Sequence, residues 1–195
     1  MAEKEAEKCA LYVLEIPTPT AMTPEASGEA DTPAKTAGLI CWHSKSGIHV
    51  ENLGSNGAEI PSCADAISPQ LRESDFLLVM LGTNDLLQGL SPEETAARMK
   101  TFLQQLLLRH RRILLIAPPP MKRGAWVASD SLIEASWALA GEYRQLAAQL
   151  KIPFADTRRW NVDLTFDGVH FSEEGHHTFA ANIVCAVQPW LYTSG

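Results

Sequence analysis

Four residues near the end of the chain, Asp167-Gly168-Val169-His170, have types and a spacing suited to acid–base chemistry. An aspartate three residues before a histidine can hydrogen-bond one ring nitrogen and fix the tautomer. The other nitrogen can then act as a general base. A surface histidine in a loop would give the same pattern, so the spacing alone leaves both interpretations open. We therefore treat Asp167 and His170 as candidate catalytic residues.

Two glycine-containing turns earlier in the chain could donate hydrogen bonds to a developing negative charge. Leu81-Gly82-Thr83-Asn84-Asp85 follows the most apolar run, and there Asn84 could aim an amide N–H at an oxyanion while Asp85 caps the turn. Asn52-Leu53-Gly54-Ser55-Asn56-Gly57 follows a shorter apolar stretch, and Gly54 would expose a backbone N–H. An ordinary Asx turn explains the first pattern equally well, and a phosphate-binding loop would resemble the second.

A metal site formed by His170, His176 and His177 is a competing interpretation, because carboxylates lie close by in the sequence. Adjacent His176 and His177 would point in different directions on a helix, and the spacing fits no familiar zinc pattern. We therefore expect no metal, and the sequence implies no organic cofactor.

These candidates would be positioned by strands and helices that alternate from about residue 48 onward. Short continuous apolar runs predict buried strands, and Ser91-Pro92-Glu93-Glu94 is a capping box that predicts a helix start. Further helices are expected to begin near Ser131 and after Ser172. The expected strands are residues 48–50, 76–81, 112–117 and 152–155, with one short strand at most over residues 10–16. This order predicts an α/β fold with three layers, α/β/α, and a doubly wound, mostly parallel sheet that binds ligands at the carboxyl ends of its strands.

The bulk properties describe an ordinary globular protein. The 195 residues favour one domain, and 46% hydrophobic and 20% charged residues allow a core to form. A net charge of −7 argues against nucleic acid or an anionic membrane as the main partner. The sequence contains no apolar run of transmembrane length and no signal-peptide core, so we expect a cytoplasmic protein. Cys9, Cys41, Cys63 and Cys185 show no paired spacing, which favours free thiols.

Taken in order, the turns and the Asp-x-x-His motif resemble the SGNH hydrolases, the superfamily of GDSL-type serine esterases. In that family the glycine after the second strand, the asparagine of a Gly-x-Asn-Asp turn and the final Asp-x-x-His match Gly54, Asn84, Asp167 and His170. The resemblance covers about residues 48–191. It is nearest to the bacterial arylesterase and acyltransferase group, which shares the Leu-Gly-Thr-Asn-Asp turn and a proline run like Pro118-Pro119-Pro120. It implies the flavodoxin-like fold of that superfamily.

The family's nucleophile is the serine of a Gly-Asp-Ser motif after the first strand, and this sequence contains no such motif. It also lacks the Gly-x-Ser-x-Gly elbow of other hydrolases. Ser44 and Ser46 lie too close to Gly54 in the sequence to end the preceding strand, and Ser55 belongs to the second turn itself. We therefore identify no nucleophile, and we expect the chain as written to be inactive.

A shifted reading frame over about residues 1–45 would account for the missing motif. Codons for residues 14–24 can be chosen so that the neighbouring frame reads Gly-Asp-Ser-Asn-Thr-Tyr-Gly-Tyr-Asp-Pro, a typical first motif of the family. A match of ten consecutive residues is hard to obtain by chance, because each shifted codon allows only a few residues. We therefore expect residues 1–45 to be an irregular, out-of-frame segment and residues 46–195 to form the hydrolase-type domain.

The resemblance implies a carboxylic-ester hydrolase that acts on small esters: aryl esters, short acyl esters or acetylated carbohydrates. Met121, Trp126 and Trp160 are candidate pocket walls, although packing in the core or in loops is the commoner role of such residues. Two alternatives stay open. One is a non-catalytic pseudoenzyme that binds a small ester or acetylated sugar, and the other is a flavodoxin-like binding module with a chance resemblance. A homo-oligomer is also left open, because some members of the group assemble.

Overall fold

The computed structural model describes residues 10–14, 49–52, 57–63, 76–110 and 112–191, and the fold is given for these residues. The strands are β1 (Ala10–Leu14), β2 (His49–Asn52), β3 (Phe76–Val79), β4 (Ile113–Ile116) and β5 (Phe154–Ala155). They form one sheet in the order β2-β1-β3-β4-β5, and every neighbouring pair is parallel. This is the flavodoxin-like strand order, so the predicted fold class is confirmed.

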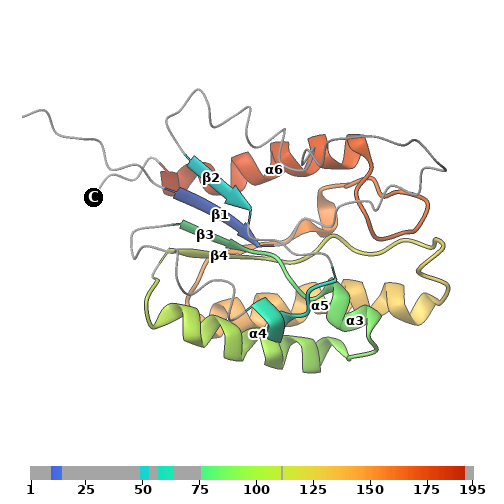
Figure 1. The fold of residues 1–195 in the computed structure, drawn as a ribbon, viewed down its shortest axis with the longest axis horizontal. Helices are drawn as coiled ribbons and strands as arrows, with labels where there is room; N and C mark the ends of the chain where they lie inside the picture. The colour runs from blue at the N-terminus through green and yellow to red at the C-terminus, as the bar shows by residue number, and fades with distance from the viewer. Residues whose placement is uncertain (1–9, 15–48, 53–56, 64–75, 111, 192–195) are drawn as a thin grey trace, which may run out of the picture.

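Helices cover both faces of this sheet. They are α3 (Thr83–Leu87), α4 (Pro92–Leu107), α5 (Asp130–Leu150) and α6 (Glu173–Leu191), with 3₁₀ turns η2 (Ile60–Cys63) and η3 (Thr157–Arg159). Figure 1 shows α6 on one face of the sheet and α4 and α5 on the other. The three layers therefore match the α/β/α arrangement expected from the alternation of strands and helices.

The core divides into two apolar clusters because neighbouring residues of a strand point to opposite faces. Leu77 and Val79 of β3 pack in the cluster that includes α4 and α5. Phe76 and Leu78 pack in the cluster that includes Phe179 of α6. All four are at most 1% exposed, and burying each side chain stabilises the fold by roughly 1.5–3 kcal/mol. Continuous apolar strands are therefore what a sheet covered on both faces requires.

The helix starts follow local capping rules. The Ser91 hydroxyl accepts from the Glu94 N–H at 3.1 Å, and the Glu94 carboxylate accepts from the Ser91 N–H at 2.8 Å. This is the predicted capping box. The helix expected near Ser131 begins one residue earlier, at Asp130, because Ser129 caps it by accepting from the Leu132 N–H.

Most strands are shorter than their apolar runs. Met80 and Leu81 are buried, yet they lie beyond the end of β3 and lead into the turn that follows. Ala10–Leu14 forms β1 between β2 and β3, so the chain before residue 46 contributes a central strand to the sheet. The irregular segment expected after that strand lies outside the described residues. Across the part of the chain that the structure describes, no helix combines the length and apolar character needed to span a membrane.

Candidate active site

The turn after β3 is held in a backbone conformation that only glycine adopts easily. Gly82 has φ of 117°, and a Cβ built there would lie 2.5 Å from the Tyr143 hydroxyl oxygen. Tyr143, buried on α5, donates from this hydroxyl to the carbonyl oxygen of Leu81 at 2.9 Å. The sharp turn therefore rests against α5, and α3 begins at the next residue, Thr83.

Asn84 lies in the first turn of α3, and its side chain is fixed by a distant carbonyl group. The Asn84 Nδ2 donates to the carbonyl oxygen of Ala58 at 2.9 Å. An amide nitrogen carries two hydrogens in one plane, so this bond also sets the direction of the second N–H. The structure therefore gives Asn84 a defined amide orientation, as an oxyanion donor requires.

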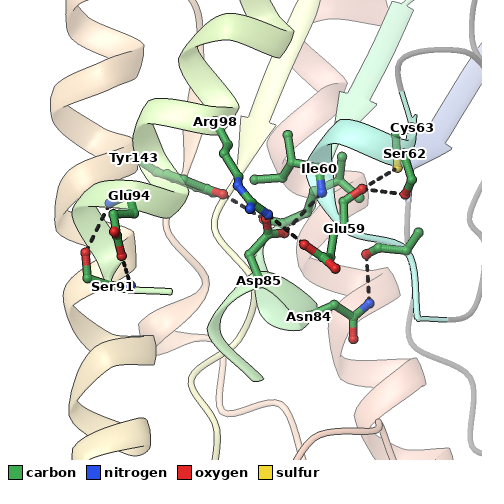
Figure 2. A network of polar contacts seen from close by, with 12 residues as sticks. Glu59, Ile60, Ser62, Cys63, Asn84, Asp85, Ser91, Glu94, Arg98 and Tyr143 are labelled. Atoms are coloured by element: carbon green, nitrogen blue, oxygen red, sulfur yellow. Dashed lines mark hydrogen bonds and ion pairs between the residues drawn. The ribbon is translucent and has the colours of Figure 1, made fainter. Parts of the chain in front are cut away.

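Asp85 does not cap its own turn as expected. Its side chain is fully buried, and one carboxylate oxygen accepts from the Ile60 N–H at 3.1 Å. The other oxygen accepts from Arg98 of α4 at 2.8 Å. The expectation was wrong because a buried carboxylate needs a cation and strong donors, and a distant helix and η2 supply them (Figure 2).

Asp167 and His170 form the predicted pair. The Asp167 Oδ2 lies 2.7 Å from the His170 Nδ1. The Asp167 Oδ1 accepts from the backbone N–H groups of Val169 at 2.8 Å and His170 at 2.9 Å. Both residues are buried, with exposed fractions of 6% for Asp167 and 9% for His170. An ionised Asp167 places the ring proton on Nδ1, which leaves Nε2 as the acceptor nitrogen.

The pKa of Asp167 is lower than its ordinary value. Burial is the largest single influence and would raise the pKa, but the hydrogen bonds that the carboxylate accepts, first those from the backbone of Val169 and His170 and then that from the His170 ring, lower it overall. Asp167 is therefore ionised at neutral pH, and it can stabilise a positive charge on His170.

A loop after β4 supports this pair through backbone contacts that the sequence analysis did not predict. The Lys122 N–H donates to the Gly168 carbonyl at 3.0 Å, and the Trp126 N–H donates to the Asp167 carbonyl at 3.1 Å. A Cβ at Gly124 would lie 2.3 Å from the Asp167 carbonyl carbon, so the two loops touch at a glycine. Gly124 and Gly168 are the residues in the sequence that could have indicated this contact, because a close approach of two backbone segments favours glycine.

The three candidate wall residues lie in different surroundings. The Trp126 ring packs edge-on against the His170 ring, with centroids 4.9 Å apart, and Trp126 is 54% exposed. Met121 is 3% exposed and belongs to the core cluster on the α4 and α5 face. Trp160 packs on Phe179 of α6, with ring centroids 5.5 Å apart. The structure therefore brings Trp126 to the histidine and places the other two in packing positions.

Several of the predicted site residues lie outside the part of the chain that the structure describes. Gly54 lies outside the described residues, as do Ser44, Ser46 and Ser55. Figure 1 shows α3 and the loop that leads into α6 toward the same end of the sheet, the end to which the strand arrows point. That Asn84 and His170 face each other across a cleft stays a prediction. No group of three or more metal-ligating side chains gathers among the described residues.

This arrangement offers an imidazole oriented by a carboxylate, an oriented side-chain amide and an exposed aromatic ring. A model of the GDSL-like lipase/acylhydrolase family matches residues 26–178. A search of curated proteins gave no match.

Solved structures similar to this chain include several bacterial esterases. One is a carbohydrate acetylesterase from Sinorhizobium meliloti, with 20% identity, coverage of 94% of this chain and 100% of that chain, and a TM-score of 0.70. Another is a putative arylesterase from Agrobacterium tumefaciens, with 21% identity, coverage of 93% and 99%, and a TM-score of 0.73. An aryl esterase from M. smegmatis has 20% identity, coverage of 93% and 99%, and a TM-score of 0.70. At these identities the likeness establishes the fold.

Proposed function

The chain belongs to the GDSL-like lipase/acylhydrolase family, and from this premise we propose that its site is built to hydrolyse small carboxylic esters by acyl transfer. In this mechanism the His170 Nε2 takes the proton of an attacking hydroxyl and returns it to the leaving alcohol. Asp167 orients the ring and stabilises the imidazolium. The observation that carries the proposal is the 2.7 Å contact between the Asp167 Oδ2 and the His170 Nδ1.

The oxyanion of the tetrahedral intermediate would be held by the Asn84 amide and the Gly54 backbone N–H. The proposal for Asn84 is supported by its bond to Ala58, which fixes the plane of the amide. Donors that are oriented before the reaction stabilise developing charge without the cost of reorganisation, and one such donor contributes roughly 10²–10³ in rate.

The nucleophile is proposed to be the serine of the Gly-Asp-Ser motif that a shifted frame over residues 14–24 would encode. Within the described part of the chain, no serine hydroxyl is hydrogen-bonded to His170. Ser172, the nearest in sequence, instead donates to the Asp163 carboxylate at 2.6 Å and caps α6. We infer that the chain as written has no turnover, and that the gene with its frame restored encodes an esterase.

The substrate is proposed to be an ester that carries a ring, either an aryl group or a sugar. Two similar structures are described as an aryl esterase and a carbohydrate acetylesterase. Trp126 supports the proposal because it is half exposed beside His170, and its backbone is tied to Asp167. An exposed aromatic face offers a flat apolar surface on which either kind of ring can stack.

The test compares the chain as written with a frame-restored chain in the hydrolysis of phenyl acetate. We expect hydrolysis only from the restored chain, and His170→Ala in that chain should lower kcat by roughly 10³-fold or more. His177→Ala is the matched control, because His177 is an exposed histidine on α6 and should leave kcat unchanged. Hydrolysis that survives His170→Ala would refute the proposal.

Genomic DNA across codons 8–48 decides between this proposal and the pseudoenzyme alternative, which the missing serine motif favours. If the DNA confirms the present reading frame and the chain binds phenyl acetate without turnover, the pseudoenzyme is correct. A frame error in that stretch would support the esterase.

A further inference from the structure

One cation joins two carboxylates behind the turn that carries Asn84. The Arg98 Nη1 donates to the Asp85 Oδ1 at 2.8 Å and to the Glu59 Oε2 at 2.6 Å (Figure 2). The Asp85 side chain is fully buried, whereas those of Arg98 and Glu59 are 35% and 38% exposed. Removing the cation would leave a buried charge without its partner, which is far more costly than losing a surface ion pair.

Three consecutive residues each bond to a different part of this network. Ala58 accepts from Asn84, Glu59 accepts from Arg98, and Ile60 donates its backbone N–H to Asp85. Residues 58–60 are thereby tied to α3 and α4 at three successive positions. The same segment begins four residues after Gly54, the second residue expected to donate to an oxyanion.

We propose that Arg98 is a positioning residue that acts through Asp85 to hold the Asn84 amide and residues 58–60 in one fixed arrangement. We call the contacts of Arg98 with Asp85 and Glu59 the clamp. The assignment of Asn84 and Gly54 as oxyanion donors rests on the proposed function, whereas the clamp rests on these contacts alone. A group that is misplaced by about 1 Å can cost roughly 10²-fold in rate, so such a site needs rigid support behind it. Arg98 supplies this support with one nitrogen that reaches both carboxylates.

The first test measures the clamp without any activity, by NMR on the full chain. Arg98→Met should move both side-chain amide resonances of Asn84 and speed hydrogen exchange at the Ile60 amide by at least about tenfold, which corresponds to 1.4 kcal/mol. Arg158→Met is the matched control, because Arg158 pairs with Asp156 away from this network and is similarly exposed, at 27%. It should leave both signals unchanged.

Unchanged Asn84 resonances and unchanged Ile60 exchange in folded Arg98→Met would overturn the proposal. If Arg98→Met does not fold, Arg98→Gln serves the same test, because it removes the positive charge and leaves a polar side chain in its place. The Asn84 side-chain amide resonances and the Ile60 amide exchange are measured again, and unchanged values of both would overturn the proposal.

The second test uses ester hydrolysis by the frame-restored chain. Arg98→Met should lower kcat roughly 10- to 100-fold with KM within about twofold, because it disturbs a donor that acts mainly in the transition state. Arg98→Lys keeps the charge, so it should restore at least a third of the decrease in log kcat that Arg98→Met causes. A loss confined to KM, or an equal loss in Arg158→Met, would overturn the proposal. If His170→Ala leaves hydrolysis unchanged, the proposed function fails, and the NMR test still decides the clamp.

Discussion

The most direct test of the Asp167–His170 pair is Asp167→Asn, which keeps the size of the side chain and removes its charge. The Asp167 Oδ1 accepts two backbone N–H groups, from Val169 and His170, at 2.8 and 2.9 Å. In the variant, the carbonyl oxygen of the asparagine would take the position of the Oδ1, because both N–H groups need an acceptor there. The NH₂ group would then take the position of the Oδ2, which lies 2.7 Å from the His170 Nδ1. An NH₂ group only donates, so the Nδ1 must accept and the ring proton must move to the Nε2.

Asp167→Asn should be less stable because three hydrogen bonds to a charged carboxylate become hydrogen bonds of a neutral amide. A bond to a charged group contributes about 1.5–3 kcal/mol and a neutral bond about 0.5–1.5 kcal/mol, so each bond loses roughly 1 kcal/mol. The variant no longer buries a charge, which offsets part of this loss. We expect Asp167→Asn to lower the free energy of unfolding by about 1–2 kcal/mol at pH 7.

The pH dependence has a defined sign. Burial of Asp167 acts to raise its pKa, and the hydrogen bonds to its carboxylate act to lower it. The net result is a folded-state pKa below the ordinary value of 3.8. The stability that ionised Asp167 contributes is therefore fully present above about pH 3.8 and is lost as the pH falls through the folded-state pKa. The difference between wild type and Asp167→Asn should narrow below pH 4.

Two measurements check these expectations. Long-range ¹H–¹⁵N NMR of the His170 ring should place the proton on Nδ1 in the wild type and on Nε2 in the variant, and urea unfolding at pH 7 and near pH 3 gives the stability difference. Asp163→Asn is the control, because Asp163 accepts from Ser172 near the same loop and does not touch His170. The same tautomer in wild type and Asp167→Asn, or a stability difference that does not change with pH, would refute the reasoning.

Four further substitutions test other parts of the structure. Gly82→Ala should lower the free energy of unfolding by roughly 2–4 kcal/mol in urea titrations, because φ is 117° and the new Cβ meets the Tyr143 hydroxyl. Tyr143→Phe should cost about 1–2 kcal/mol in the same assay by removing the bond to the Leu81 carbonyl; an unchanged midpoint would contradict this. Trp126→Ala in the frame-restored chain should raise KM for phenyl acetate about fivefold and leave KM for ethyl acetate within about twofold, since half the ring faces solvent; an equal rise for both esters would exclude ring stacking. Asp156→Asn should cost about 1 kcal/mol at pH 7, and this difference should fade as the pH drops toward 2, because Arg158 lowers the pKa of Asp156 to about 2; a gap that persists in acid would count against the ion pair.

The elements predicted well from the sequence are those fixed by neighbours along the chain. The Ser91 cap needs only Glu94 three residues later, and the Asp167–His170 bond likewise spans three residues. The adjacent β3 and β4 strands could be predicted because each is apolar throughout and a helical pattern lies between them.

The features missed are those that depend on contacts between distant residues. Arg98 reaches Glu59 across 39 positions, and in the sequence it resembles any charged residue on an exposed helix face. Trp126 and Trp160 are equivalent as aromatic candidates in the sequence, but the fold places one beside His170 and packs the other on Phe179. Local chemistry gave no means of choosing between them.

The contact between the loop after β4 and the Asp167 loop has a consequence for how this site can diversify. The hydrogen bonds of Lys122, Ala125 and Trp126 to the second loop all come from backbone N–H groups. Backbone bonds survive a change of side chain, so the residues at 125 and 126 can vary while His170 keeps its position. Selection can therefore change the side chains that surround His170 without rebuilding the Asp167–His170 pair. Gly124 and Gly168 are the exceptions, because the loops meet there at distances that leave no room for a Cβ.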